Sequence, residues 1–246
     1  MRFQRSHGSH VLGGCLGFGA PAALPPEADA LNRADVLFVQ LPRHLLQVPC
    51  RAALARAVLD GVRWIVSKAV KGETHVVINI SYGSAAGPHD GSSILEKGLD
   101  AIVAAFNAQQ GAACKLEIIF AAGNEYNKRL HAQVPAPTRQ TPSKLTWRVL
   151  PGNEMPAFME IWVPSDWNDV TVNVLPPDEI GAAKVLATPT GGSTFWPSKK
   201  ACVWAVLNTQ WRGADDARMI LLRLAPTLTY DGSPSAPAGD WMVTIC

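Results

Sequence analysis

The first half of the chain alternates between two hydrophobic patterns. Apolar runs without polar alternation predict buried strands at 36–41, 75–81 and 116–122. Between them, apolar residues recur every three or four positions and predict two helices, one over 53–70 and one that opens at the capping box Ser93-Ile94-Leu95-Glu96. Buried strands separated by helices are typical of a parallel sheet covered on both faces, so this half is predicted to be α/β.

The pattern changes near residue 133. The stretch VPAPTRQTPSKL is rich in Pro, Ser and Thr, which is typical of a linker. Beyond it, turns rich in Pro, Gly, Asp and Asn separate short strand-like runs at 145–150, 158–163, 170–175, 201–207, 219–225 and 241–245. Short strands at this spacing predict an antiparallel β-sandwich of the jelly-roll kind. We therefore expect two domains, residues 1–135 and residues 142–246.

Composition and charge narrow the classes of function. Apolar residues make up 48% of the 246 residues and charged residues 17%, enough for a sizeable core. The net charge is +2 without a basic stripe, which argues against a nucleic-acid partner. No apolar run reaches the roughly 18 residues that a membrane span needs. The cysteines are odd in number and lack zinc spacing, which predicts free thiols, no metal site and a reducing compartment such as the cytoplasm: Cys15, Cys50, Cys114, Cys202 and Cys246.

Two of the predicted strands end in small and polar residues. The first is followed by Ser81-Tyr82-Gly83 and the second runs into Ala121-Ala122-Gly123-Asn124. Ligands of parallel α/β sheets bind outside the carboxyl ends of the strands, so these two segments propose a binding site. Two ordinary strand-to-loop exits would give the same pattern.

A third segment, His7-Gly8-Ser9-His10-Val11, lies near the beginning of the chain. Gly8 allows close approach of the backbone and Ser9 can cap a following helical turn, so the segment can present an imidazole at the edge of a sheet. Taken alone, the segment also fits a surface histidine pair. A metal pair formed by His7 and His10 lacks further ligands at a recognisable spacing.

The three segments, in this order, resemble those of the subtilase (subtilisin-like serine peptidase) family. His7 to Val11 match its H-G-[ST]-H-V segment, Ser81 to Gly83 its S-x-G segment, and Ala121 to Asn124 its A-A-G-N segment. The resemblance covers about residues 5–132. It implies a partial subtilisin-like parallel sheet with flanking helices, a polypeptide substrate, and no cofactor apart from the structural calcium that full-length members can carry.

The resemblance also implies a role for each matched residue. His7 is expected to be the general base, and Asn124 is expected to donate its side-chain amide to the oxyanion. The backbone of Ser81-Tyr82-Gly83 is expected to pair with the substrate as an added strand. The small residues Ala121, Ala122 and Gly123 are expected to line a pocket for an apolar side chain.

The chain departs from the family pattern at the other two triad positions. The family orders its triad Asp, His, Ser, but only six residues precede His7 and none is Asp. Residues 191–197 keep the Gly, Ser and Pro spacing of the family's G-T-S-x-A-x-P segment. However, Phe195 and Trp196 stand where small residues are needed, so we expect residues 188–200 to be a loop and the match of Ser193 to be accidental.

Three interpretations follow from these departures. In the first, the chain is a fragment of a subtilisin-like serine endopeptidase whose β-sandwich is inserted between the oxyanion asparagine and the serine, as in some bacterial subtilases. In the second, it is a catalytically inactive homologue that binds a protein or ligand. In the third, it is a complete enzyme that uses Ser193. Outside the three segments, residues 87–91 predict a turn, with a calcium or substrate contact from Asp90 as the alternative, and His131 is expected to be structural.

Overall fold

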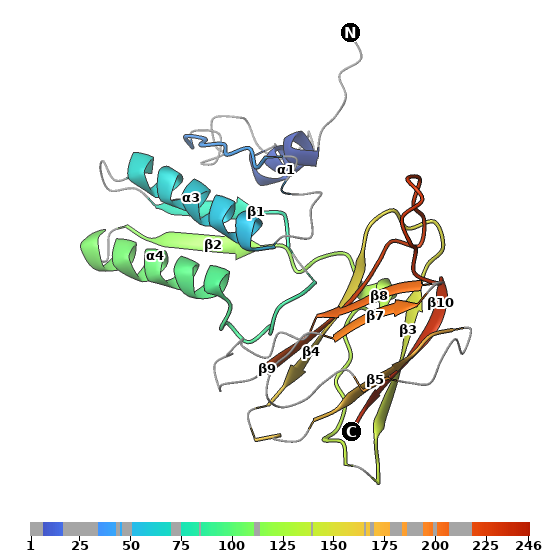
Figure 1. Ribbon diagram of the computed structural model, residues 1–246. Coiled ribbons are helices and arrows are strands. Elements are labelled where there is room, and N and C mark those ends of the chain that lie inside the picture. The colour runs from blue at the N-terminus through green and yellow to red at the C-terminus, as the bar shows by residue number, and fades with distance from the viewer. Residues whose placement is uncertain are drawn as a thin grey trace. The chain divides into compact units, whose positions relative to one another are not determined.

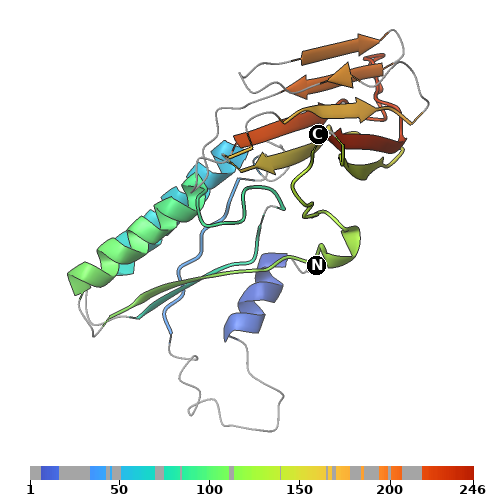
Figure 2. The same cartoon turned by 90° about the horizontal axis from the view of Figure 1, so that it is seen from below.

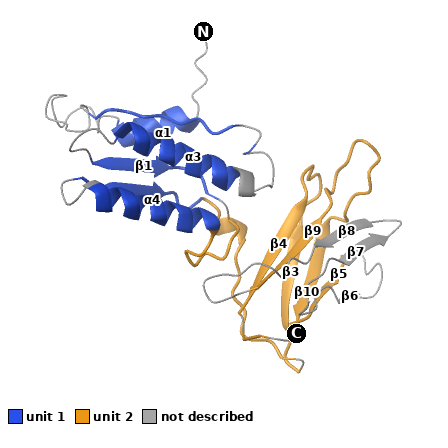
Figure 3. Cartoon of the chain, turned by 60° about the vertical axis from the view of Figure 1, so that its left-hand side comes forward, with its two compact units in different colours: residues 1–83, 94–123 blue, residues 84–93, 124–246 orange. Residues whose placement is uncertain are grey.

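The chain divides into two compact units, which are described separately (Figure 3). The computed structural model describes residues 7–16, 34–42, 45, 51–69, 75–83, 85–110, 114–138, 140–164, 166–167, 170–177, 184–185, 194–198, 201–206 and 218–246. Unit 1 consists of residues 1–83 and 94–123, and unit 2 consists of residues 84–93 and 124–246.

Unit 1 is a small parallel sheet with helices (Figure 1). Its elements in chain order are α1 (His7–Leu16), α3 (Arg51–Ala69), β1 (Val76–Ile80), α4 (Ile94–Gln110) and β2 (Leu116–Phe120). β1 and β2 pair in parallel, from Val76 opposite Leu116 to Ile80 opposite Phe120. Figure 2 shows α3 and α4 together on one side of the two strands and α1 on the other. The predicted α/β class of this half is confirmed.

The core of unit 1 comes from the apolar faces that the helical periodicity predicts. Val58 and Val62 of α3 and Leu99 and Phe106 of α4 are buried, together with Ile78 and Leu116 of the strands. Burial of each such side chain contributes roughly 1.5–3 kcal/mol. A Cβ at Gly98 would lie 2.8 Å from Leu59 Cδ2, so a glycine at this position lets α4 approach α3 closely.

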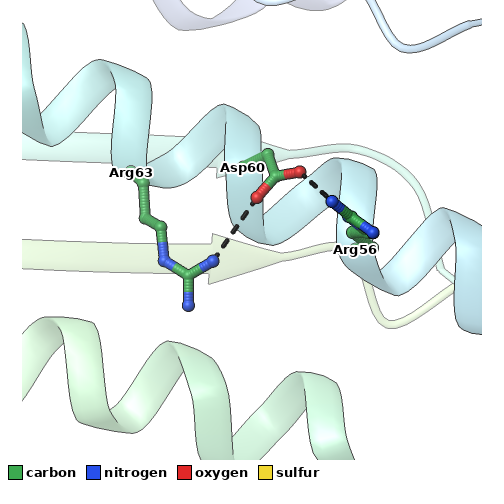
Figure 4. A network of polar contacts seen from close by, with 3 residues as sticks. All are labelled: Arg56, Asp60 and Arg63. Atoms are coloured by element: carbon green, nitrogen blue, oxygen red, sulfur yellow. Dashed lines mark hydrogen bonds and ion pairs between the residues drawn. The ribbon is translucent and has the colours of Figure 1, made fainter.

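The solvent-facing side of α3 carries an exposed charge network (Figure 4). The Asp60 carboxylate lies 3.6 Å from Arg56 Nε and 3.4 Å from Arg63 Nη1, and these two residues stand at the i−4 and i+3 positions of the helix. Exposed pairs of this kind contribute about 0.3–0.5 kcal/mol each. The stability of α3 therefore depends mainly on its buried face.

The strand predicted over 36–41 is wrong. The described residues 34–42 have no regular secondary structure. Two of their side chains instead pack against helices. Phe38 lies 3.5 Å from where a Cβ on Gly8 of α1 would stand, and Val39 lies 3.0 Å from where a Cβ on Gly61 of α3 would stand. An apolar run becomes a strand only when a neighbouring backbone completes its hydrogen-bond ladder, and no such ladder is formed within the described part of the chain.

Unit 2 is built from two four-stranded antiparallel sheets that follow the short 3-10 helix η4 (Tyr126–Lys128). In spatial order, one sheet contains β3 (Ser143–Val149), β10 (Gly239–Ile245), β5 (Val172–Leu175) and β6 (Lys184–Val185). The other contains β4 (Ala157–Val163), β9 (Arg218–Leu224), β8 (Ala201–Val206) and β7 (Thr194–Ser198). This arrangement confirms the predicted antiparallel β-sandwich.

The two sheets share one core because alternate residues of their strands are buried. On β10, Trp241, Val243 and Ile245 are buried, and the buried residues of β9 in the other sheet join the same cluster. The Trp241 indole is fully buried, and its Nε1–H donates to the carbonyl of Pro237 at 3.1 Å. A buried Trp whose donor is satisfied adds apolar area without an unpaired polar group.

The segment between the two predicted domains attaches to the sandwich. Val134 packs against the core of unit 2, and Ser143 Oγ donates to the carbonyl of Pro135 at 3.3 Å. The described residues of 129–142 form no helix or strand. The domain boundary between residues 135 and 142 stays a prediction.

The loop predicted over 188–200 is wrong for residues 194–198. These residues form β7, which pairs with β8 from Thr194 opposite Ala205 to Ser198 opposite Ala201. Thr, Phe and Trp favour strands, and Pro197 is tolerated because β7 is the edge of its sheet, where a missing N–H breaks no inner ladder. Ser193 lies outside the described residues.

Two further expectations concern thiols and membranes. Among the residues that the structure describes, Cys15, Cys114 and Cys246 form no disulfide, and Cys114 is buried. No helix in the described ranges is both long and apolar enough to cross a bilayer.

Arg148 of β3 and Asp240 of β10 form a bidentate pair across the first sheet. Arg148 Nε donates to one carboxylate oxygen at 2.7 Å and its terminal nitrogen donates to the other at 2.8 Å. The hydrogen bond from Arg148, together with its charge, holds the pKa of Asp240 below the ordinary value of 3.8, and Asp240 raises the pKa of Arg148. The carboxylate form of Asp240 is therefore favoured in the folded chain.

We predict that Asp240→Asn lowers the melting temperature of the chain at neutral pH but not in acid. Because the pKa of Asp240 is lower in the folded state, its contribution to stability is complete above the unfolded pKa of about 3.9 and is lost as the pH falls through the folded value. Melting curves of both proteins from pH 7 down to pH 2 test this. A difference in melting temperature that is independent of pH would contradict the role of the pair.

Candidate active site

The two strand-end segments of unit 1 leave the sheet side by side. The parallel register pairs Ile80 with Phe120, and Ala121 N–H donates to the carbonyl of Ile80 at 3.2 Å. The ladder thus continues one residue past β2, and the two segments begin at the same edge (Figure 1). A Cβ at Gly83 would lie 3.6 Å from the carbonyl oxygen of Ala121, so the segments remain neighbours for several residues.

The segment after β1 presents its backbone at the surface. Asn79 Nδ2 donates to Ser81 Oγ at 2.9 Å, which directs the hydroxyl back along the strand. Tyr82 and Gly83 are exposed. An exposed extended segment at a sheet edge can hydrogen-bond an external peptide as an added strand.

His7 lies at the end of β1. Its Nε2 is 3.4 Å from the backbone carbonyl oxygen of Ser81, 74 residues further along the chain. A carbonyl can only accept, so this contact requires a proton on Nε2. The structure therefore brings together the predicted base and the predicted substrate segment, although they lie far apart in the sequence.

Most residues of the helix that carries His7 are exposed. No residue of α1 is buried, and among the described residues nothing lies within 4 Å of a Cβ at Gly13 or Gly14. Besides the contact with Ser81, the aromatic ring of Phe38 covers Gly8, while 58% of that side chain stays exposed. Sequence reasoning assigned Phe38 to a strand and missed this role. The only signal was one aromatic residue within a mainly branched aliphatic run.

The segment after β2 consists of exposed small residues. Ala121, Ala122 and Gly123 are all exposed, and Gly123 has a φ of +94°, which favours glycine. Asn124 follows directly, is exposed, and is the first residue of the longer segment of unit 2. The separation between His7 and Asn124 spans the two units and stays a prediction.

The turn predicted at residues 87–91 is confirmed. Ser92 N–H donates to Asp90 Oδ1 at 2.8 Å, and φ is positive at Gly87, His89 and Gly91. His131 contacts His89 edge-on, with the ring centroids 6.2 Å apart. Within the described ranges, no three His, Cys, Asp or Glu side chains gather as a metal-binding group.

Comparison with known proteins supports the fold. No protein-family model matches the chain, and no curated protein matches it. Among solved structures, it is similar to the Clostridium perfringens CspB protease, with a TM-score of 0.59 and 19% identity. The match covers 78% of this chain and 36% of that one, so this chain spans about a third of the length of that protease. At this identity the likeness shows the fold: a small parallel sheet with helices and antiparallel sheets, as in part of that protease.

We predict that Phe38→Ala releases α1 from unit 1. A ten-residue helix with two internal glycines is unstable by itself, so it depends on contacts such as that between Phe38 and Gly8. Hydrogen exchange of the α1 amides should become several-fold faster, while exchange in α3 and α4 stays unchanged. Phe38→Leu, which keeps an apolar contact, is the matched control. Equal exchange of α1 in the wild type and Phe38→Ala would contradict this role.

Proposed function

We propose that this chain forms the histidine, substrate-strand and oxyanion segments of a subtilisin-like serine endopeptidase. The observation that carries the proposal is the 3.4 Å approach of His7 Nε2 to the carbonyl of Ser81, at the edge where both strand-end motifs begin. The fold likeness to part of the CspB protease supports it. The class of substrate is a polypeptide.

The substrate would bind as an added strand. Backbone groups of Ser81 and Gly83 would pair with the peptide, which selects an extended backbone rather than a particular sequence. Ala121, Ala122 and Gly123 have small or no side chains and would leave space for an apolar residue next to the scissile bond. Gly83 lets the peptide approach because it carries no Cβ.

In this reaction His7 would transfer one proton, and Asn124 would stabilise one developing negative charge. His7 would take the proton of the nucleophilic serine on the ring nitrogen that carries no proton, which is Nδ1 when Nε2–H donates to Ser81, as the serine oxygen bonds to the scissile carbonyl carbon. It would return the proton to the leaving amine as the C–N bond breaks. Asn124 would donate its side-chain amide to the oxyanion formed in between. In subtilisin itself, removal of the equivalent donor costs about 2.7–4 kcal/mol of transition-state stabilisation.

A second candidate is a catalytically inactive homologue that binds peptides at the same edge. The observation that favours it over an enzyme using Ser193 is β7, because the residues after Ser193 form an edge strand. The family's nucleophile instead stands at the beginning of a helix. Both candidates share the peptide-binding segments and differ only in whether bond cleavage follows.

We predict that an apolar tetrapeptide, fluorescein-labelled Ala-Ala-Pro-Phe, binds this edge. Gly83→Pro should weaken the affinity about tenfold, because proline removes one backbone N–H that would pair with the peptide. Gly13→Ala is the control, since no atom of the described residues lies within 4 Å of a Cβ at that position of α1. Fluorescence polarisation measures the three affinities. Equal affinity of the wild type and Gly83→Pro would contradict binding as an added strand.

We further predict that the chain is not labelled by a fluorophosphonate probe. An imidazole without the triad carboxylate loses about four orders of magnitude in rate, and labelling also requires an activated serine hydroxyl. The measurement compares the wild type with Ser193→Ala and His7→Ala. Labelling of the wild type that disappears in both variants would reveal a working Ser193–His7 pair and would establish a complete enzyme.

A further inference from the structure

The segment 124–134 of unit 2 is exposed along most of its length. Residues 126–133 are all exposed, with Tyr126 at 95% and Leu130 at 57% of full exposure. Within the described part of the chain, the η4 turn is held by one backbone hydrogen bond, from Lys128 N–H to the carbonyl of Glu125 at 2.9 Å, and no backbone hydrogen bond joins residues 130–134. A segment with so few backbone hydrogen bonds opens locally while the sandwich stays folded.

Two adjacent basic residues, Lys128 and Arg129, lie at the end of η4 and differ in their contacts. Lys128 Nζ lies 2.6 Å from Glu125 Oε2 and forms an ion pair with it. No such partner holds the Arg129 guanidinium within the described ranges. Arg129 also has a φ of 51°, in the left-handed region that residues with a Cβ rarely adopt. Opening of the turn therefore lets Arg129 return to an ordinary extended conformation.

We propose that the peptide bond between Arg129 and Leu130 is a cleavage site for a trypsin-like peptidase. The specificity pocket of such an enzyme carries a carboxylate, which pairs with an available guanidinium. Peptidases of this kind take their substrate as an extended strand, and the sequence of 124–134 contains no proline, so every residue keeps the N–H that this pairing uses.

The reaction is a hydrolysis. The oxygen of one water molecule adds to the carbonyl carbon of Arg129, and the C–N bond to Leu130 breaks. The oxygen remains in the new carboxylate of Arg129, and the amine of Leu130 takes up a proton. The products are residues 1–129 and 130–246, and the second contains every strand of the sandwich from β3 to β10. This inference does not depend on the function proposed above.

Exposure of a basic side chain is not sufficient for cleavage, as Arg223 of β9 illustrates. Arg223 is also exposed, but its backbone lies in a strand that is paired on both sides, opposite Phe158 of β4 and Trp204 of β8. A peptidase would have to break both ladders before that strand could enter its cleft. Arg129 combines an available side chain with a backbone outside any ladder.

One side-chain contact restrains the segment just after the proposed cleavage site. The ring of His131 contacts the ring of His89 edge-on, with the centroids 6.2 Å apart, and both residues belong to unit 2. This contact must break before residues 129–133 can extend along a peptidase. Removal of the His131 ring should therefore raise the fraction of chains that are open and the rate of cleavage.

The experiment is a brief digestion of the full chain with trypsin, in which mass spectrometry follows the fragments that begin at Leu130 and at Leu224. We expect the first to form faster by a factor on the order of a hundred, because only its bond is reached by local opening. Synthetic peptides 124–134 and 218–228, which contain the same two bonds without the fold, should be cut at similar rates.

Variants separate the contributions of single residues. Arg129→Gln should abolish the fragment that begins at Leu130, whereas Lys128→Gln, the matched control at the adjacent basic position, should keep it at no less than the wild-type rate. His131→Ala should form it about threefold faster than the wild type. All three changes are at exposed positions, so the melting temperature should stay close to that of the wild type.

Two results would overturn the proposed site. If trypsin cuts the peptide 124–134 but yields no fragment of the folded chain that begins at Leu130, the segment does not open. If the fragments that begin at Leu130 and Leu224 form at equal rates, cleavage follows unfolding of the whole chain and Arg129 has no special position. An unchanged rate in His131→Ala would contradict the restraint by His131.

Discussion

The candidate site depends on the parallel pairing of β1 with β2. Their register sets Ile80 opposite Phe120, and the hydrogen bond from Ala121 to Ile80 extends the ladder beyond the last strand residue. Side chains alternate between the two faces of a sheet, so a slip of one residue would turn Ile78 and Leu116 away from the helices that bury them. The packing of α3 and α4 therefore fixes the register, and the register fixes which residues begin the two motif segments.

The two units have separate cores. Unit 1 contains His7 and both strand ends, whereas unit 2 consists of residues 84–93 and 124–246 and contains Asn124. Position in the sequence therefore does not decide to which unit a segment belongs. Residues 84–93 lie between β1 and α4 of unit 1 in the sequence, but they make their contacts within unit 2.

Elements with a strong local pattern could be predicted from the sequence. The faces of α3 and α4, the two buried strands and most strands of the sandwich follow directly from apolar periodicity. The pattern failed at 36–41 and at 194–198, because strand formation depends on a partner backbone that local sequence does not describe. The strand-end motifs could be predicted as a site, but the contact of Phe38 with α1 and that of Glu160 with Gly87 depend on tertiary packing. Gly87 and Glu160 are 73 positions apart in the sequence.

A crystal structure of the chain with bound Ala-Ala-Pro-Phe peptide tests the proposed site most directly. We expect the peptide to lie as an added strand beside Ser81-Tyr82-Gly83, with its apolar last side chain against Ala121 and Ala122. The His7 imidazole and the Asn124 side-chain amide should approach the same peptide carbonyl group. A peptide bound elsewhere, or a separation of more than roughly 15 Å between His7 and Asn124, would contradict a peptidase-like site, since one tetrahedral centre must reach both groups.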